Sequence, residues 1–146
     1  MAAESAPAVV RLNVPCKPEF VGIARLTVLG VAGRMPFSYD EVEDVRLAVG
    51  EACTMAVERA IKANKTETDI SIVSTISGER LTIEVSDHAG RGLQQALEFQ
   101  ESSDPAEEVD EQGLGALLME LLVDEFSADS TEDGTLVRIV KYAGQV

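Results

Sequence analysis

Seven residues of this chain have types and spacings that could do chemistry together. In chain order they are Glu51, Asp87, Gly90, Gly92, Gly113, Gly115 and Thr135. A glutamate fixed on a helix can act as the base that activates a nucleophile, and an aspartate can accept a hydrogen bond from an adenine amino group. Glycines let the backbone approach a ring closely, and at a helix start they leave amide donors open to phosphate. Each feature has a use in one nucleotide site, although none is specific alone.

Each of these residues also has a purely structural explanation. Most helical glutamates are solvated and carry no chemistry, which is the simpler interpretation of Glu51 taken alone. Asp87 could cap the backbone of its own turn, and Gly113 and Gly115 could simply begin a closely packed helix. His88 is the only histidine, with no Ser or Cys partner indicated, so we expect it to be exposed. The residue types therefore leave a nucleotide site and a structural role both open.

A long helix predicted over residues 40–62 must position Glu51. Its apolar residues recur at three- and four-residue spacing, which is the period of an amphipathic helix. Ser38 can cap its start, and Glu41, three residues later, completes a capping box. Small residues surround Glu51 in the sequence, so another surface can approach it closely. They are Gly50, Ala52, Cys53 and Ala56.

Strands are predicted where apolar and polar residues alternate between turn residues. They cover residues 8–14, 68–77, 80–86, 126–130 and 136–142, the last four forming two hairpins. Strands clustered in antiparallel pairs with separate helices indicate an α+β fold. We therefore expect a two-layer α/β sandwich in which helices cover one face of a mixed, mostly antiparallel sheet.

Two further helices are predicted, one on each side of the first hairpin. The earlier one covers residues 19–34. Its buried stripe is expected to be Phe20, Ile23, Thr27 and Val31. The later one covers residues 116–123, opens after Gly113-Leu114-Gly115, and is so apolar that we expect it to be buried. The polar segment 93–112 before it has the length of a lid or binding loop.

Length and composition indicate one domain spanning residues 1–146, with a small polar tail at 1–7. The net charge of −14 disfavours direct nucleic-acid binding, which depends on Lys and Arg contacts to phosphates. An acidic surface suits a basic protein partner better. No apolar run is long enough for a transmembrane span, and the N-terminus lacks signal-peptide features, so we expect a cytoplasmic protein. Cys16 and Cys53 show no metal spacing and are expected to be reduced thiols.

In this order and fold class the sequence resembles the GHKL (Bergerat-fold) ATP-binding superfamily. More narrowly, it resembles the bacterial anti-sigma factors that are also serine-protein kinases. The sharpest matches are VRLAVGEACTMA (45–56), EVSDHAGRG (84–92), EQGLGALLMELLVDEF (111–126) and DGTLVRIVK (133–141). The resemblance implies a homodimer that binds and silences a sigma factor. It also implies binding of ATP and Mg²⁺, and phosphorylation of a serine on an anti-anti-sigma partner.

The resemblance also assigns roles to positions of this chain. Glu51 resembles the catalytic base of the family. The cofactor-binding positions are Asp87 for the adenine, Gly90 and Gly92 beside the ring, Gly113 and Gly115 on the phosphate side, and Thr135 as the hydroxyl near the adenine. The first helix and its neighbouring strand, around residues 20–34, would lie near the dimer interface.

The sequence departs from the family at the metal and at the lid. The family has an Asn four residues after the Glu, which supplies a metal oxygen, whereas here the residue is Met55. A thioether is a poor ligand for Mg²⁺. Ala89 and Arg91 occupy the glycine places of an ungapped match, and an extra residue is needed to align Gly90 and Gly92. Residues 93–137 contain no Lys or Arg, so an acidic lid would repel a triphosphate.

Two functions from different classes follow from these observations. One is an anti-sigma regulator that sequesters a sigma factor and is released by an anti-anti-sigma partner, with ATP binding and kinase activity weak or lost. The other is an active ATP-dependent serine-protein kinase that phosphorylates the anti-anti-sigma factor. The altered metal position and the acidic lid favour the first.

Overall fold

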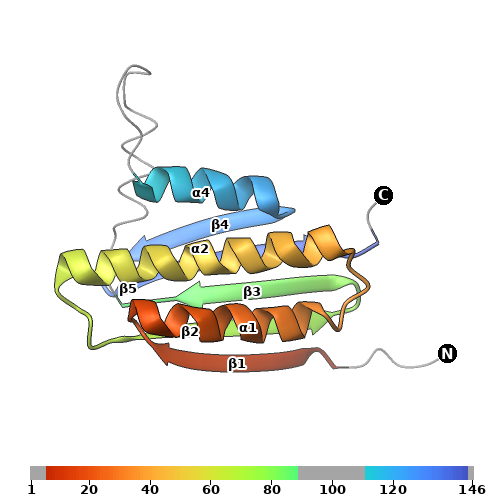
Figure 1. Cartoon of the computed structure of the whole chain (residues 1–146), viewed down its shortest axis with the longest axis horizontal. Coiled ribbons are helices and arrows are strands. Elements are labelled where there is room, and N and C mark those ends of the chain that lie inside the picture. Colours follow the sequence, from red (N-terminus) through yellow and green to blue (C-terminus); the bar gives the residue numbers. More distant parts are fainter. Residues whose placement is uncertain (1–5, 89–110, 145–146) are drawn as a thin grey trace, which may run out of the picture.

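The computed structural model of this chain describes residues 6–88 and 111–144. Within them a five-stranded sheet, in the order β1-β2-β3-β5-β4, has helices on one face (Figure 1). The strands are β1 (Ala8–Pro15), β2 (Asp69–Ser77), β3 (Arg80–Ser86), β4 (Glu125–Thr131) and β5 (Gly134–Tyr142). The helices are η1 (Pro18–Phe20), α1 (Val21–Ala32), α2 (Tyr39–Ala63) and α4 (Glu111–Leu122). The predicted α+β sandwich and its element order are confirmed.

The sheet differs from the prediction in one respect, because every pair of neighbouring strands is antiparallel rather than mixed. The two predicted hairpins are present, β2–β3 and β4–β5, and both strands of the second are longer than predicted. Alternate residues of the strands face the helices, so Ile70 and Ile72 of β2 and Leu81 and Ile83 of β3 are all buried in the core. None of the described helices is both long and apolar enough to cross a membrane.

Helix α2 is the central helix that the sequence predicts. The hydroxyl of Ser38 accepts a hydrogen bond from the Glu41 amide, and the Glu41 carboxylate accepts one from the Ser38 amide, so the capping box is confirmed. Asn64 ends the helix in the left-handed conformation, with φ 55°. The face of α2 toward the sheet is buried along its whole length, which fixes the helix as the platform for Glu51 and Met55.

The predicted buried stripe of the first helix is right at Val31 and wrong at Ile23. Val31 is buried, Phe20 and Thr27 are half-buried, and Ile23 is exposed. The remaining buried positions of α1 are Val21, Ala24, Val28 and Ala32. Pro18 begins a short 3-10 turn, so the α-helix starts later than predicted, at Val21. A 3-10 turn has three residues per turn, so Phe20 is out of step with the α-helical spacing of the residues that follow. Apolar residues also occur on both faces of α1, so spacing alone could not choose between the two stripes. Ile23 lies on the stripe of α1 that faces solvent.

The prediction for the last helix is wrong both in its start and in its burial. Helix α4 begins at Glu111, so residues 111–112, predicted as the end of the 93–112 loop, are helical. The rest of that loop lies outside the described residues. Ala116 and Met119 are buried, but most of the leucines of α4 are exposed. Figure 1 shows the reason, because α4 lies at the edge of the helical layer and has α2 on one side only.

The end of β3 and the start of β5 approach each other very closely. The amide of Asp87 donates a hydrogen bond to the carbonyl of Thr135 at 3.0 Å. A Cβ atom on Gly134 would overlap the backbone carbonyl of Asp87, so only glycine fits at that position. This contact fixes the position of Asp87 and Thr135 relative to each other.

Replacing Gly134 with alanine should therefore lower the free energy of unfolding by about 3 kcal/mol, since the added methyl meets backbone rather than a movable side chain. Gly22→Ala is the matched control, because nothing lies within 4 Å of its added Cβ on α1. That substitution should be neutral or stabilising by up to about 1 kcal/mol. Urea denaturation of both variants tests the prediction, and equal effects would contradict it.

Candidate functional site

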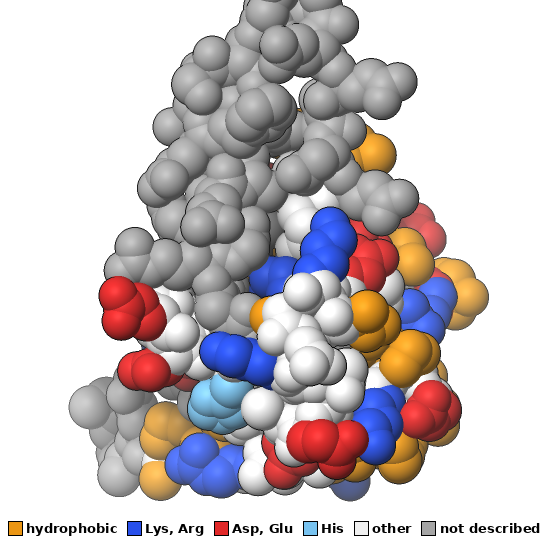
Figure 2. Space-filling model, turned by 90° about the vertical axis from the view of Figure 1, so that its left-hand side faces the viewer, with side chains coloured by type: hydrophobic (Ala, Val, Ile, Leu, Met, Phe, Trp, Pro, Cys, Tyr) orange, Lys and Arg blue, Asp and Glu red, His pale blue; other side chains and the backbone are white. Residues whose placement is uncertain are grey.

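Most of the predicted site residues that the structure describes lie toward the end of the molecule where β3 ends and β5 begins, whereas Glu51 lies midway along α2. Asp87 follows β3, Thr135 is the second residue of β5, and Glu51 lies on α2. Gly113 and Gly115 lie within the first turns of α4 rather than before it, which corrects the predicted helix start. Gly90 and Gly92 lie outside the described residues. Figure 2 shows this end of the molecule, where the single histidine, His88, is exposed as predicted.

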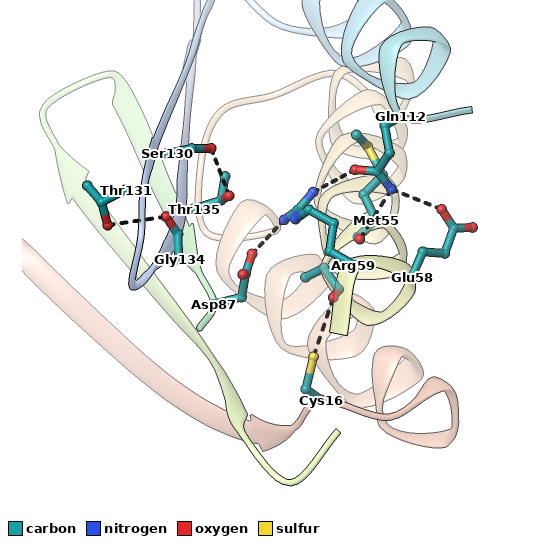
Figure 3. A network of polar contacts seen from close by, with 11 residues as sticks. Cys16, Met55, Glu58, Arg59, Asp87, Gln112, Ser130, Thr131, Gly134 and Thr135 are labelled. Carbon is teal, nitrogen blue, oxygen red and sulfur yellow. Dashed lines mark hydrogen bonds and ion pairs between the residues drawn. The ribbon is translucent and has the colours of Figure 1, made fainter. Parts of the chain in front are cut away.

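A buried ion pair occupies the carboxylate of Asp87. The guanidinium of Arg59, on α2, donates from Nη2 to Asp87 Oδ2 at 2.5 Å (Figure 3). Both residues are only 4% exposed. Removing one partner of such a pair typically costs about 3 to 5 kcal/mol, because it leaves a buried charge uncompensated. The carboxylate that the sequence assigns to adenine is therefore already engaged by the protein itself.

The same arginine ties helix α4 to helix α2. Arg59 Nη1 donates to Gln112 Oε1 at 2.8 Å, and Gln112 is itself buried in the first turn of α4. Gln112 Nε2 in turn donates to Glu58 Oε2 at 3.1 Å and to the Met55 carbonyl at 3.3 Å. We call Asp87, Arg59, Gln112 and Glu58 the Arg59 network. It connects the end of β3, the C-terminal half of α2 and the start of α4 (Figure 3).

Arg59 is the site residue that the sequence analysis missed. Its position near the end of α2 suggests only a favourable interaction with the helix dipole. One sequence signal could have revealed it, because Arg59 follows Ala52 and Ala56 along the buried stripe of the helix. A cation on a buried stripe requires an anionic partner. Among the described residues no group accepts a hydrogen bond from its buried Nε.

Glu51 is half-buried and in contact with α4. A Cβ atom on Gly115 would lie 2.6 Å from Glu51 Oε1 and 2.6 Å from the Met55 sulfur, so the two helices meet there without a side chain between them. On the other side, the guanidinium of Arg25 from α1 lies against Gly50. The small residues around Glu51 thus permit the close approach that the sequence predicts.

The electrostatic surroundings of Glu51 favour its neutral form. Burial and then the carboxylate of Glu58 raise the pKa of Glu51 above its ordinary value, while Arg25 partly opposes the shift. Glu51, Thr54 and Glu58 line a groove of about 330 Å³ beside α4. A carboxyl group with a raised pKa at the wall of a groove is suited to accept a proton.

The residues that the structure describes do not fit Mg²⁺ at the position the family uses. Met55 is fully buried, and its sulfur faces the α2–α4 contact. In the described ranges no group of three or more His, Cys, Asp or Glu side chains could hold a metal ion. A single thioether does not replace an oxygen ligand for this hard cation. The donor set around Glu51 is therefore unsuited to a magnesium–phosphate complex.

The adenine side of the site is likewise filled by contacts within the chain. Thr135 is buried, and its hydroxyl lies 2.9 Å from the hydroxyl of Ser130 on β4. Cys16 lies nearby as a free, buried thiol whose pKa is raised to about 11, chiefly by burial and then by Asp87. Its Sγ donates to the Ala56 carbonyl at 3.6 Å. Asp87 and Thr135 are thus brought together, and the side chain of each has a polar contact within the chain.

Replacing Glu51 with glutamine should stabilise the chain at neutral pH. A glutamate whose pKa in the folded state lies above the ordinary value of 4.5 stabilises the fold at pH values below 4.5. This stabilisation is lost as the pH rises through the folded-state pKa. The free energy of unfolding of Glu51→Gln, relative to the natural chain, should therefore grow as the pH rises from about 4 to 7. Urea denaturation at a series of pH values measures the difference.

Glu43→Gln is the control for this experiment, since it should behave in the opposite way. The hydrogen bond from Arg46 lowers the pKa of Glu43, so its ionised form supports folding above the ordinary pKa. The natural chain should therefore gain stability over Glu43→Gln as the pH rises. The same sign for both variants would contradict the electrostatic account of Glu51.

Comparison with known proteins gives a consistent result across the chain. A family model described as a histidine kinase-like ATPase domain matches residues 14–141. The serine-protein kinase RsbW of Bacillus subtilis is 40% identical over 137 residues, covering 91% of this chain and 84% of the relative. The serine-protein kinase RsbW of Bacillus licheniformis is 36% identical with the same coverage.

Two solved structures share the fold. A chain of the SiaB–SiaC complex from Pseudomonas aeruginosa matches with a TM-score of 0.67 at 14% identity, covering 90% of this chain and 88% of that one. The RsbU and RsbW domains of a Mycobacterium tuberculosis protein match with a TM-score of 0.64 at 15% identity, covering 91% of this chain and 32% of that one. At these identities the likeness shows the fold alone.

Proposed function

Because this chain belongs to the family of histidine kinase-like ATPase domains, and within it to the RsbW serine-protein kinases, we propose that it is an anti-sigma regulatory protein. It sequesters a sigma factor and is released by an anti-anti-sigma partner, while its own ATP binding and kinase activity are weak or lost. Sigma-factor sequestration takes place in the cytoplasm, where the proposal places the chain.

One observation carries this proposal, namely that Arg59 engages the carboxylate of Asp87. A base could reach that carboxylate only by displacing a buried guanidinium, at a cost of about 3 to 5 kcal/mol if the arginine found no new partner. That cost corresponds to a loss of about two to three orders of magnitude or more in affinity. The contact of Gly115 with Glu51 and Met55 supports the same conclusion on the phosphate side.

The charge of the chain supports a protein partner. A net charge of −14 gives long-range attraction to a basic patch, and a sigma factor needs such a patch for promoter DNA. An acidic protein on that patch would compete with the DNA. Sequestration therefore requires neither a bound nucleotide nor a chemical step.

A homodimer forms part of the proposal. Helix α1 exposes Ile23, Leu26 and Leu29, and an apolar groove of about 590 Å³ lies between α1 and the edge of the sheet. Val10 and Ile76 from β1 and β2 line that groove together with Val31. A second copy covering this face would remove the exposed apolar side chains from water.

The alternative function is an active serine-protein kinase. Its support is that Glu51, with its raised pKa, lines a groove beside α4 where it could accept a proton. Incubation with labelled ATP and the cognate anti-anti-sigma factor separates the two functions. Phosphoserine on that partner, lost in Glu51→Gln, would establish the kinase; no phosphoserine would support the regulator without catalysis.

Titration calorimetry with Mg-ATP tests the engaged site directly. We expect binding weaker than the micromolar range for the natural chain, and binding at least about tenfold tighter for the double variant Met55→Asn/Arg59→Ala, which restores an oxygen ligand and frees the Asp87 carboxylate. Gln112→Ala is a milder variant, because it removes the contact between Arg59 and α4 while the Arg59–Asp87 ion pair stays in place.

Arg46→Ala is the matched control for this titration, because Arg46 forms an ion pair with Glu43 on the surface of α2 and lies outside the Arg59 network. It should leave nucleotide binding unchanged. Circular dichroism establishes that each variant is folded. Micromolar binding by the natural chain, with no gain in the double variant, would contradict the proposal.

Binding to the cognate sigma factor should weaken as salt is raised from about 0.05 to 0.5 M, because the Debye length shortens to a few ångströms. The decrease should appear mainly in the association rate, as steering by the acidic surface is lost. Surface plasmon resonance at several salt concentrations measures it. Association rates that do not depend on salt would contradict the proposal that the acidic surface attracts a basic partner.

A further inference from the structure

Helix α4 exposes a stripe of leucines. Leu114, Leu117, Leu118 and Leu121 recur at three-, four- and seven-residue spacing, so they share one side of the helix. Leu114 is 60% exposed and Leu121 is 85% exposed. Single exposed leucines are ordinary, but a continuous apolar stripe on a soluble protein marks an interaction surface. We call these four residues the α4 leucine face.

A groove runs beside this face, between α4 and α2. Leu114, Gly115 and Leu118 form its wall on α4, and Glu51, Thr54 and Glu58 form its wall on α2. Two of the three α2 side chains are carboxylates. An apolar wall opposite a negative wall is complementary to a helix with leucine-like side chains on one side and Lys or Arg on the flank.

The other charges around the α4 leucine face are also negative. Glu120, Asp124 and Glu125 are exposed on α4 and just after it, and residues 93–137 contain no Lys or Arg. Two cations near this end of the described structure already have partners within the chain. Arg59 is held by Asp87, and Lys141 donates to the Leu122 carbonyl at the end of α4. Among the described residues, a ligand on this face would therefore meet mainly carboxylates, with the Lys141 ammonium at the C-terminal end of α4 and Arg25 beyond Glu51 as cations.

We propose that the α4 leucine face and the groove beside it dock a basic amphipathic helix of a protein partner. This inference rests on the proposed function and deepens it, since it names the surface and the chemistry of the partner. A second copy of this chain fits the face poorly, because it would bring a second set of carboxylates against the first. The surface also lies apart from α1 and β1, where we place the homodimer contact.

The experiment uses the full chain and a labelled synthetic helical peptide with leucines on one side and lysines elsewhere. Leu118→Gln and Leu121→Gln remove apolar area while keeping a good helix former. Each should weaken peptide binding, measured by fluorescence anisotropy, by about tenfold, since a buried leucine is worth about one order of magnitude or more. Leu136→Gln, an exposed leucine on β5 that belongs neither to the α4 leucine face nor to the α1 dimer contact, is the control and should change binding less than about twofold.

A second peptide, with glutamate in place of every lysine, should not bind. Equal losses for Leu136→Gln and the α4 variants would overturn the proposal, because binding would then not depend on where the leucine lies. Binding of both peptides would also overturn it, because binding would then not depend on charge. Analytical ultracentrifugation provides another decisive outcome. If Leu121→Gln converts a dimer into a monomer, the face is a contact between copies and the proposal is wrong.

The cognate sigma factor separates this inference from the proposed function. If the natural chain binds no sigma factor, the proposed function fails, whereas specific peptide loss in the α4 variants still supports the docking surface. If Leu118→Gln and Leu121→Gln bind both sigma factor and anti-anti-sigma factor as tightly as the natural chain, the docking surface fails and the proposed function stands.

Discussion

The buried ion pair between Arg59 and Asp87 is the interaction on which this end of the molecule depends. It joins Asp87, the first residue after β3, to α2. Through Gln112, Arg59 also holds the first turn of α4. Neither charge could remain buried without the other. The Arg59 network thus holds the first turn of α4 against α2, together with the core packing of Ala116 and Met119.

This arrangement explains how the fold can persist while the chemistry of the site changes. The sheet, the capping box of α2 and the Gly134 contact stabilise the fold without any ligand. Asp87 keeps its place because Arg59 supplies the positive partner that a buried carboxylate requires. We propose that a carboxylate satisfied in this way no longer selects a base, and that the scaffold serves instead as a surface for protein partners, which needs shape and charge but no reactive group.

Much of the fold could be predicted because its determinants are local. The capping box of Ser38 and Glu41, the Ser77-Gly78 turn and the alternating strands are all set by residues close together in sequence. The faces of α1 and α4 could not be predicted in the same way. Both helices are apolar on more than one side, and only their place in the helical layer decides which side is buried.

The same distinction between local and long-range contacts applies to the candidate site. The sequence order identified Glu51, Asp87 and Thr135, and the structure brings Asp87 and Thr135 into contact across β3 and β5. Arg59 escaped prediction because its partners lie 28 and 53 residues away in the chain. Nothing in the local pattern around Arg59 distinguishes a cation at a helix end from a cation in a buried pair. Long-range contacts of this kind decide whether an inherited site still works.

A crystal structure of the chain grown with saturating Mg-ATP tests the central claim most directly. We predict that Arg59 still contacts Asp87, that Gly115 still packs against Glu51 and Met55, and that no metal or phosphate is ordered beside Glu51. Magnesium and phosphates seated beside Glu51, with the adenine amino group on Asp87 and Arg59 displaced, would contradict the account.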